Sequence, residues 1–264
     1  MECAVPQPVA PGAREAMTTA LACVGLVKRF GGVVAADELT LSVARGEIHA
    51  LIGPNGAGKS TAIALLAGEL RPDAGLVLLQ GADVTGLSVA SRARRGLIRS
   101  YQITSVLPAF TARQNLALAT QVRSGHSFRL WGDASRDPGL RRAAERLLER
   151  IGLAGRADVR AEDLSHGEQR QLELGMGLAC DPSVLLLDEP MAGLGPSESG
   201  AMVALVAGLR GSVSVLLVEH DMDAVFALAD RLTVLVSGRS IATGTPEEIR
   251  GDAAVRNAYL GEEA

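Results

Sequence analysis

The chain has 264 residues and a formal net charge of −4, and 47% of its residues are hydrophobic although only 3% are aromatic. This length fits one large domain with or without an inserted subdomain. The acidic balance gives no general case for nucleic-acid binding, because phosphate backbones are held mainly by an excess of Lys and Arg. The three cysteines are too few and too scattered for a disulfide framework or a Cys-x-x-Cys metal site, so we expect free thiols.

The N-terminal segment, residues 1–16, holds three prolines among small and polar residues, a composition that predicts disorder. It lacks the charged-then-apolar profile of a signal peptide. The sequence also has no uninterrupted apolar run approaching the ~18 residues that a membrane-spanning helix needs. We therefore expect a cytoplasmic protein.

The first elements predict a β layer followed by a strand, a loop and a helix. Apolar residues recur in short β-like stretches from Ala20 to about Val43, interrupted by Phe30-Gly31-Gly32, which favours an antiparallel edge layer. Glu47 to Ile52 then predicts a compact strand, and Lys59 to Leu70 has the apolar spacing of a helix. A glycine-rich loop joins the two.

The middle of the chain, roughly Ser91 to Pro182, lacks clear strands and predicts a helical insertion. Its clearest amphipathic helix runs from Leu140 to Ile151. Residues 121–139 show no periodicity and are expected to form a variable loop. Four arginines near the start of this region are expected on a solvated helix face: Arg92, Arg94, Arg95 and Arg99.

Two later segments, Val184 to Leu187 and Val213 to Val218, are nearly unbroken apolar runs, as in strands buried on both faces of a parallel sheet. Acidic or ionisable residues follow them directly. In open α/β sheets the carboxyl ends of the strands line the ligand crevice. We therefore expect Asp188, Glu189 and His220 to lie near the glycine-rich loop.

The glycine-rich loop fits the pattern G-x-x-x-x-G-K-S between a predicted strand and helix, and is a P-loop. Its backbone N–H groups and the helix N-terminus would surround phosphate oxygens, and Lys59 would add a charge at the β and γ phosphates. Ser60 would offer its hydroxyl to Mg²⁺. The predicted phosphate-binding residues are Gly53, Pro54, Asn55, Gly56, Ala57, Gly58, Lys59, Ser60 and Thr61.

Two adjacent carboxylates after the strand that begins at Val184 are the usual partners of such a loop. Asp188 would hold Mg²⁺, directly or through water. Glu189 would polarise the water that attacks the γ-phosphate, which requires a carboxylate within hydrogen-bond reach of that water.

A second phosphate site is indicated by Leu164-Ser165-His166-Gly167-Glu168-Gln169. A small hydroxyl residue and a glycine open a helix from about Glu168 to Ala179, so that Ser165, backbone N–H groups and the helix dipole face an anion. The alternative is that Ser165 is only a helix N-cap. The motif resembles the signature of ABC ATPases, and the chain after residue 20 follows the order of that family.

This resemblance implies an α/β fold: a P-loop NTPase (RecA-like) core with an antiparallel β subdomain and an inserted α-helical subdomain. The ATPase domain would cover residues 17–264, with the core at about 17–90 and 183–264 and the helical subdomain at about 91–182. It also implies that Ser165, Gly167 and Glu168 bind the ATP held by the P-loop of an opposite subunit.

The resemblance assigns three further residues. Phe30 matches the aromatic residue that stacks on adenine, although a lone Phe after a strand is often simple packing. Gln102 matches the glutamine that links Mg²⁺ and the attacking water to the helical subdomain, and His220 matches the histidine that contacts the γ-phosphate. Two positions depart from the pattern: His166 replaces the usual glycine of the signature, and Gly195 stands where many members have aspartate.

The partners that the resemblance implies are a second ABC ATPase subunit, two transmembrane permease subunits and an extracytoplasmic solute-binding protein. The permeases would hold the chain at the inner face of the membrane, docking near Gln102 and Val106-Leu107-Pro108. No nucleic acid is expected as a partner.

Five segments are similar to the branched-chain amino-acid importer ATPases: Phe30 to Ala35, Ile98 to Gln102, the loop before Leu140, Ala192 to Leu194 and Ala258 to Gly261. Other members of that group serve urea, short amides or aromatic acids. A lipopolysaccharide exporter, a soluble ABC protein and a P-loop kinase or GTPase are further alternatives. A kinase or GTPase would lack the signature.

Overall fold

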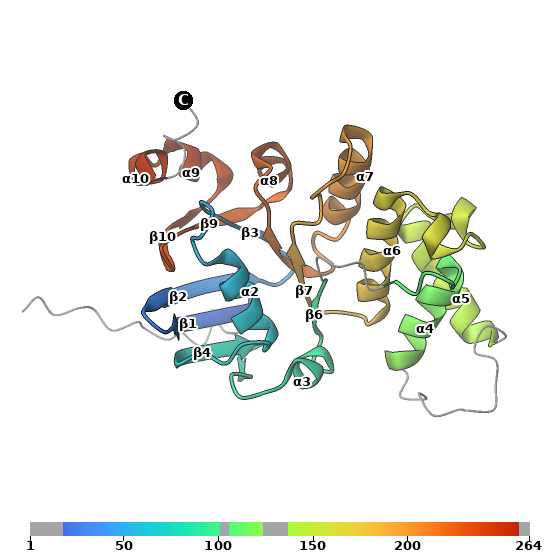
Figure 1. Cartoon of the computed structure of the whole chain (residues 1–264), viewed down its shortest axis with the longest axis horizontal. Coiled ribbons are helices and arrows are strands. Elements are labelled where there is room, and N and C mark those ends of the chain that lie inside the picture. The colour runs from blue at the N-terminus through green and yellow to red at the C-terminus, as the bar shows by residue number, and fades with distance from the viewer. Residues whose placement is uncertain (1–17, 101–105, 124–136, 259–264) are drawn as a thin grey trace, which may run out of the picture.

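A computed structural model describes residues 18–100, 106–123 and 137–258 of the chain. The predictions for residues 1–16, for Gln102 and for most of the loop 121–139 lie outside these ranges. The described elements form two β-sheets with helices around them (Figure 1). Among the described helices, none combines the length and the hydropathy that a membrane span requires.

The first sheet is antiparallel, as the sequence predicts, with the strand order β2-β1-β4-β5. The strands β1 and β2 form a long hairpin that turns at Gly31-Gly32. The buried thiol of Cys23 lies in β1, and burial raises its pKa to about 12. The strands are β1 (Thr19–Phe30), β2 (Val33–Ala44), β4 (Ala74–Leu79) and β5 (Ala82–Asp83).

The second sheet has the order β10-β9-β3-β8-β7-β6, and every neighbouring pair is parallel except β10 with β9. Its three central strands, β3, β8 and β7, are buried at every position. Asp188 pairs with Val218, which pairs with Leu51, so the carboxyl ends of these strands lie in one row. The strands are β3 (Ile48–Ile52), β6 (Leu97–Arg99), β7 (Val184–Asp188), β8 (Ser214–Val218), β9 (Arg231–Val236) and β10 (Arg239–Gly244).

Residues 91–182, in which the sequence shows no clear strand, contain a short strand. Residues 97–99 form β6, which pairs with β7 at the edge of the second sheet. Three residues are too few to show the alternation by which a strand is recognised. The division into a core and a helical subdomain stays a prediction, and β6 favours a first boundary after Arg99.

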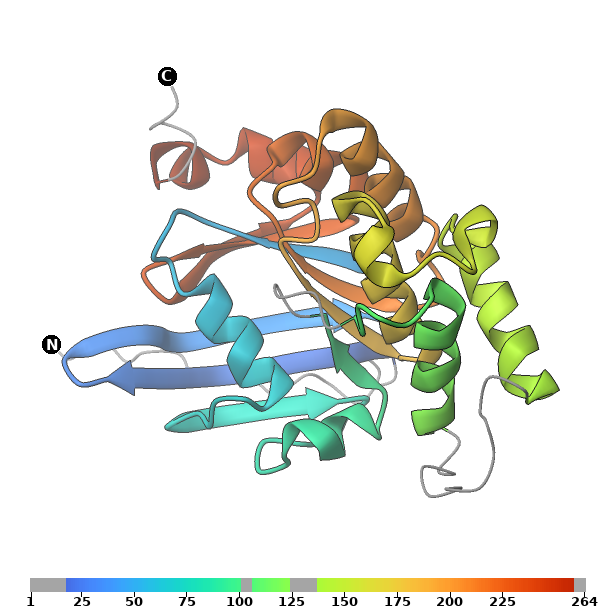
Figure 2. The same cartoon turned by 45° about the vertical axis from the view of Figure 1, so that its right-hand side comes forward.

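The helix α2 (Lys59–Ala67) packs between the sheets and contacts β2 of the first and β6 and β7 of the second. Its Ile63, Leu65 and Leu66 share one apolar cluster with residues of both sheets. Figures 1 and 2 show α4, α5 and α6 grouped on the side of the second sheet away from the antiparallel sheet. These three helices are α4 (Ala112–Arg123), α5 (Pro138–Arg150) and α6 (His166–Ala179).

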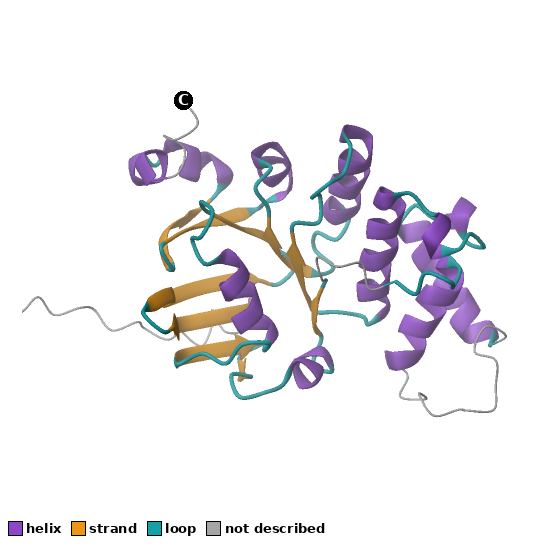
Figure 3. Ribbon diagram, viewed as in Figure 1, coloured by secondary structure: helices purple, strands orange, loops and turns teal. Residues whose placement is uncertain are grey.

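The remaining helices lie along the second sheet, with α7 to α10 on one side of it and α3 beside β6 (Figures 1 and 3). The helices α8 and α9 pack on β3 and β9 through a cluster that includes Val225, Ile249 and Val234. The elements are α3 (Val89–Ala93), α7 (Pro196–Ala207), α8 (Met222–Leu228), α9 (Pro246–Gly251), α10 (Ala253–Ala258) and two short 3₁₀ turns (Ala154–Arg156 and Ala161–Asp163).

The four arginines expected on one solvated helix face do not share such a face. Arg92 in α3 is only 1% exposed, and its guanidinium donates to the carbonyl oxygens of Leu65 and Leu66 at 2.8 and 2.6 Å. Arg99 lies on β6. Only Arg94 and Arg95 are exposed, because burial follows tertiary contacts that local composition does not encode.

Candidate functional site

The P-loop lies between β3 and α2, as predicted, and its backbone is shaped for close approach. Gly53 has φ 153°, and a Cβ there would lie 2.0 Å from the Leu235 carbonyl oxygen. Gly58 has φ 103° and would meet the Ala35 carbonyl oxygen at 2.3 Å. Only glycine fits either position. A further bond from the Gly238 amide to the Ala57 carbonyl at 2.8 Å anchors the loop.

The first turn of α2 is left open to an anion. Its N-cap, Gly58, has no side chain to accept the free N–H groups, and the first turn holds no acidic residue. Ser60 at this end is exposed, and Thr61 follows it half-buried. Free N–H groups and the positive end of the helix dipole together bind phosphate.

Lys59 reaches back over the P-loop instead of into solvent. Its ammonium donates to the carbonyl oxygens of Gly53 at 2.6 Å and Pro54 at 3.0 Å. Burial lowers the pKa of Lys59, and the charges of Glu189 and Asp188 partly offset this effect. The end of β7 therefore acts electrostatically on the P-loop lysine, as the strand-end argument predicts.

Asp188 ends β7 with a carboxylate that is almost fully buried, at 3% exposure. Arg99 donates to Asp188 Oδ2 at 2.9 Å and also pairs with Glu69, just beyond α2. Asp188 Oδ1 is buried and has no hydrogen-bond partner among the described residues. An orphaned carboxylate oxygen beside a phosphate loop fits Mg²⁺, which is bound through one or two carboxylates and substrate phosphates.

Glu189 follows Asp188 with φ 51°, a left-handed conformation that is uncommon for residues other than glycine. Its amide donates to the Val218 carbonyl at 2.8 Å, which ties this turn to β8. His220 Nδ1 lies 3.9 Å from Glu189 Oε1, and the His220 side chain is 63% exposed. The two predicted groups are thus neighbours, in a position where water can reach both.

The predicted signature forms the N-terminus of α6. Ser165 is the N-cap: its hydroxyl accepts from the Glu168 amide at 3.2 Å, and Glu168 Oε2 accepts from the Ser165 amide at 2.9 Å. Arg156 also pairs with Glu168, at 2.9 Å. The carboxylate of Glu168 is therefore engaged within the chain, and a part for it in phosphate binding stays a prediction.

A carboxylate that the sequence did not single out lies on this same helix end. Glu198 Oε1 accepts from Ser165 Oγ at 2.9 Å and from the Gly167 amide at 3.2 Å. Hydrogen bonds from Ser165, Gly167 and Gly195 lower the pKa of Glu198. The run Gly195-Pro196-Ser197-Glu198 signals a helix start with its N3 glutamate. It gives no sign that this glutamate reaches Ser165.

Phe30 lies at the end of β1 and is 47% exposed, so the structure disfavours simple core packing as its role. Lys28 Nζ lies 5.6 Å from the centre of its ring.

Glu219 is another residue that the sequence did not single out. Its carboxylate accepts from the Met191 amide at 2.8 Å, and burial raises the pKa of Glu219. It fixes the turn that carries Met191 beside His220.

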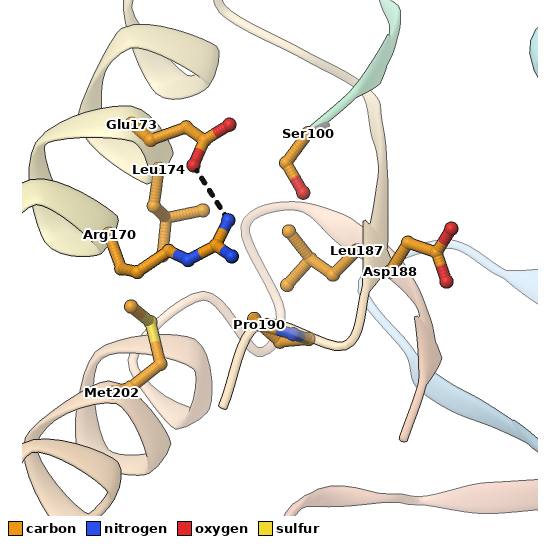
Figure 4. Close-up of a pocket in the computed structure, with 8 residues that line it drawn as sticks. All are labelled: Ser100, Arg170, Glu173, Leu174, Leu187, Asp188, Pro190 and Met202. Atoms are coloured by element: carbon orange, nitrogen blue, oxygen red, sulfur yellow. Dashed lines mark hydrogen bonds and ion pairs between the residues drawn. The ribbon is translucent and has the colours of Figure 1, made fainter. Parts of the chain in front are cut away.

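A small pocket opens behind the end of β7 (Figure 4). Arg170 and Glu173 of α6 form an ion pair at 3.2 Å on one side of it, and Ser100 lies opposite. The Asp188 side chain points away from this pair. The pocket therefore lies between α6 and the strand end, on the side away from the Asp188 carboxylate.

Comparison with known proteins shows which family the chain belongs to. Residues 36–192 match the family described as ABC transporter, which is more than half of the chain. The chain belongs to the ABC transporter ATP-binding family. The chain is therefore an ABC ATPase, and the alternative of a P-loop kinase or GTPase is excluded. Residues 239–264 match a second family, described as branched-chain amino acid ATP-binding cassette transporter.

The curated relatives point to the same group. The chain is 40% identical over 253 residues to the high-affinity branched-chain amino acid transport ATP-binding protein LivG of Salmonella typhimurium, covering 92% of this chain and 98% of the relative. It is 38% identical over 247 residues to BraF of Pseudomonas aeruginosa, a protein of the same description, covering 90% and 96%.

A solved structure confirms the fold. The ADP conformation of MJ1267, an ATP-binding cassette of an ABC transporter, matches with a TM-score of 0.81 and 30% identity, covering 92% of this chain and 99% of that chain. The predicted α/β P-loop fold with an antiparallel sheet and added helices is thus confirmed.

Proposed function

We propose that this chain hydrolyses ATP with Mg²⁺ and powers the import of branched-chain amino acids through separate permease subunits. The observation that supports this most directly is that the P-loop follows β3 while Asp188 and Glu189 lie at the neighbouring carboxyl end of β7, where their charges act on Lys59. It combines a phosphate-binding cation with a metal-binding and a water-activating carboxylate.

Each residue has one task in this proposal. The P-loop from Gly53 to Thr61 binds the phosphates through its available backbone N–H groups and Lys59, and Phe30 stacks on the adenine. Asp188 Oδ1, Ser60 and Gln102 hold Mg²⁺, which when bound would neutralise charge on the phosphates. Glu189 takes a proton from the attacking water, and His220 contacts the γ-phosphate and orients the Glu189 carboxylate.

Closure of two chains around ATP is the mechanical step. Ser165, Gly167 and Glu168 of one chain would meet the γ-phosphate held by the P-loop of the other, so that each nucleotide bridges two chains. Loss of the γ-phosphate removes the bridge and favours opening. Two permease subunits, near Val106 to Pro108 at the inner face of the membrane, would take up this motion, and a solute-binding protein would deliver the cargo.

The cargo rests on similarity alone, since an ATPase subunit does not touch the solute. LivG and BraF are described as branched-chain amino acid transport proteins. The C-terminal residues 239–264 match a family of the same cargo. Leucine, isoleucine and valine are therefore the proposed solutes, and urea or short amides are the alternatives.

The test of the catalytic role is the variant Glu189→Gln. It should lose about 10²- to 10⁴-fold in hydrolysis, the range for a general base, while it still binds ATP and forms dimers with it. Glu149→Gln, at an exposed position of α5, is the matched control and should keep full activity. Full hydrolysis by Glu189→Gln would remove Glu189 from the mechanism.

The shared site has its own variant, Ser165→Arg. It should bind ATP but fail to dimerise or hydrolyse, because an arginine at the start of α6 blocks the approach of the second chain. Hydrolysis at the wild-type rate would overturn the shared site.

The cargo is tested by uptake of labelled leucine. In cells that lack the gene, uptake should return with the wild-type chain and not with Glu189→Gln. Competition by urea and amides identifies the alternatives.

A further inference from the structure

The carboxylate of Glu198 lies on the donors that the proposed function assigns to the γ-phosphate. Its Oε1 accepts from Ser165 Oγ at 2.9 Å and from the Gly167 amide at 3.2 Å. A Cβ built on Gly167 would lie 2.6 Å from the carboxyl carbon of Glu198. The missing side chain of Gly167 thus makes room for the glutamate of α7.

The proton inventory shows that these donors serve one anion at a time. A serine hydroxyl carries one proton and a backbone amide carries one. Both protons point to Glu198 Oε1, so neither is left for a phosphate oxygen while the contact lasts. A carboxylate at this position also repels a phosphate that approaches the same helix end.

We propose that Glu198 is a positioning residue that occupies the signature donors of the separate chain and has to release them when the γ-phosphate of a second chain docks. This inference rests on the proposed function, because it assumes that the signature binds ATP across a dimer. It adds a step to closure: the carboxylate leaves Ser165 and Gly167 before these groups bind phosphate. In the free chain, the Glu198 carboxylate takes the place of the phosphate and keeps the N-terminus of α6 in its phosphate-binding shape.

Capping of α7 accounts for only part of what Glu198 does. Glu198 Oε2 accepts from the Gly195 amide at 3.4 Å as the N3 residue of α7, and Gly195 has no side chain to complete a capping box. Glu248 is likewise the N3 residue of α9, which begins at Pro246, and its carboxylate accepts from the amide of the N-cap Thr245 at 2.8 Å. Both glutamates cap their own helix. Glu198 in addition accepts from the N-terminus of a different helix, α6.

The contact has a measurable consequence for closure. When the competent state is only a fraction of the population, the apparent affinity falls by that fraction. Contact with Glu198 lowers the fraction of chains whose signature is free. Removing the charge of Glu198 should therefore lower the ATP concentration needed for dimerisation and leave binding of ADP to the P-loop unchanged.

The experiment compares dimerisation with ATP in chains that carry Glu189→Gln, so that hydrolysis does not interfere. Sedimentation gives the ATP concentration at half dimerisation for this background alone and with Glu198→Gln or Glu248→Gln added. Glu198→Gln should lower that concentration about fivefold or more, the lower end of usual coupling between sites. Glu248→Gln should not change it. A fluorescent ADP analogue should bind all three proteins equally.

The ATP concentration at half dimerisation tests the role of Glu198 separately from the proposed function. An equal or higher ATP concentration for Glu198→Gln than for its background overturns the inference and leaves the proposed function standing. A complete lack of ATP-dependent dimers in the Glu189→Gln background overturns the proposed function, and the inference with it. If Glu198→Gln does not fold, Glu198→Asp shortens the side chain by one methylene, breaks the reach to Ser165 and should lower the concentration to a smaller extent.

Discussion

Two helix N-termini in this chain are assigned to phosphate, and they are built in opposite ways. The first turn of α2 has no side-chain cap and no acidic residue. The first turn of α6 has a serine cap, a capping-box glutamate and the carboxylate of Glu198. The N-terminus of α2 has no side-chain cap on its backbone donors, while the N-terminus of α6 is occupied by groups of the protein. A free chain is therefore ready to take nucleotide before it is ready to close.

The open end of α2 is offset by contacts at its other end. Arg92 donates to Leu65 and Leu66 in the last turn, where a cation is favoured by the helix dipole. Arg99 joins Glu69, just past the helix, to Asp188. Substitutions of Arg99 and Arg92 therefore test how much the site depends on these contacts.

Arg99→Met should destabilise the chain by about 3–5 kcal/mol, because it leaves the buried Asp188 carboxylate without its partner. Urea unfolding measures the change. Arg113→Met is the control: Arg113 pairs with Asp158 and Glu145, which are 80% and 43% exposed, so its loss should cost less than about 1 kcal/mol. Equal losses would show that Arg99 does not hold the site together.

Arg92→Met should cost about 3 kcal/mol, because the buried carbonyl oxygens of Leu65 and Leu66 lose a charged donor. The control is Arg94→Met at the C-cap of the same helix, an exposed residue whose replacement should stay within about 0.5 kcal/mol. Thermal unfolding distinguishes the two. A mild effect of Arg92→Met would mean that α2 does not depend on its last turn.

Lys59→Ala should weaken ATP binding about 10- to 150-fold, the value of one hydrogen bond to a charged group. Titration with a fluorescent ATP analogue measures it. The fold should persist, since among the described residues the Lys59 ammonium donates only to carbonyls of the loop itself. Unchanged affinity would show that the open amides of the P-loop suffice without the cation.

The pH dependence of Glu198 gives the smallest effect. Hydrogen bonds from Ser165 and then from the Gly167 and Gly195 amides lower its pKa below the ordinary 4.5. The stability that this carboxylate contributes is therefore complete above the pKa of the unfolded chain and is lost as the pH falls through the folded pKa. Wild type should be more stable than Glu198→Gln at pH ~7, and the difference should shrink as the pH falls below the ordinary pKa of 4.5. A constant difference would contradict the contact.

The sequence predicted those parts of the site that local patterns encode. The P-loop has a fixed spacing between a strand and a helix, and the apolar runs before Asp188 and His220 predicted buried strands that end at one edge. The contacts of Arg99 with Asp188 and of Glu198 with Ser165 join residues 89 and 33 positions apart. No local period reports such contacts, so arginine and glutamate were indistinguishable from surface charges until the fold placed them.

The thiol of Cys23 gives the antiparallel sheet a chemical reporter. Only the thiolate reacts with alkylating agents, and a thiol with a pKa of about 12 has almost none at neutral pH. Cys180 is half-buried and more accessible to reagent. Alkylation of Cys23 therefore requires β1 to separate from its neighbours, and its rate records how often the layer that carries Phe30 opens.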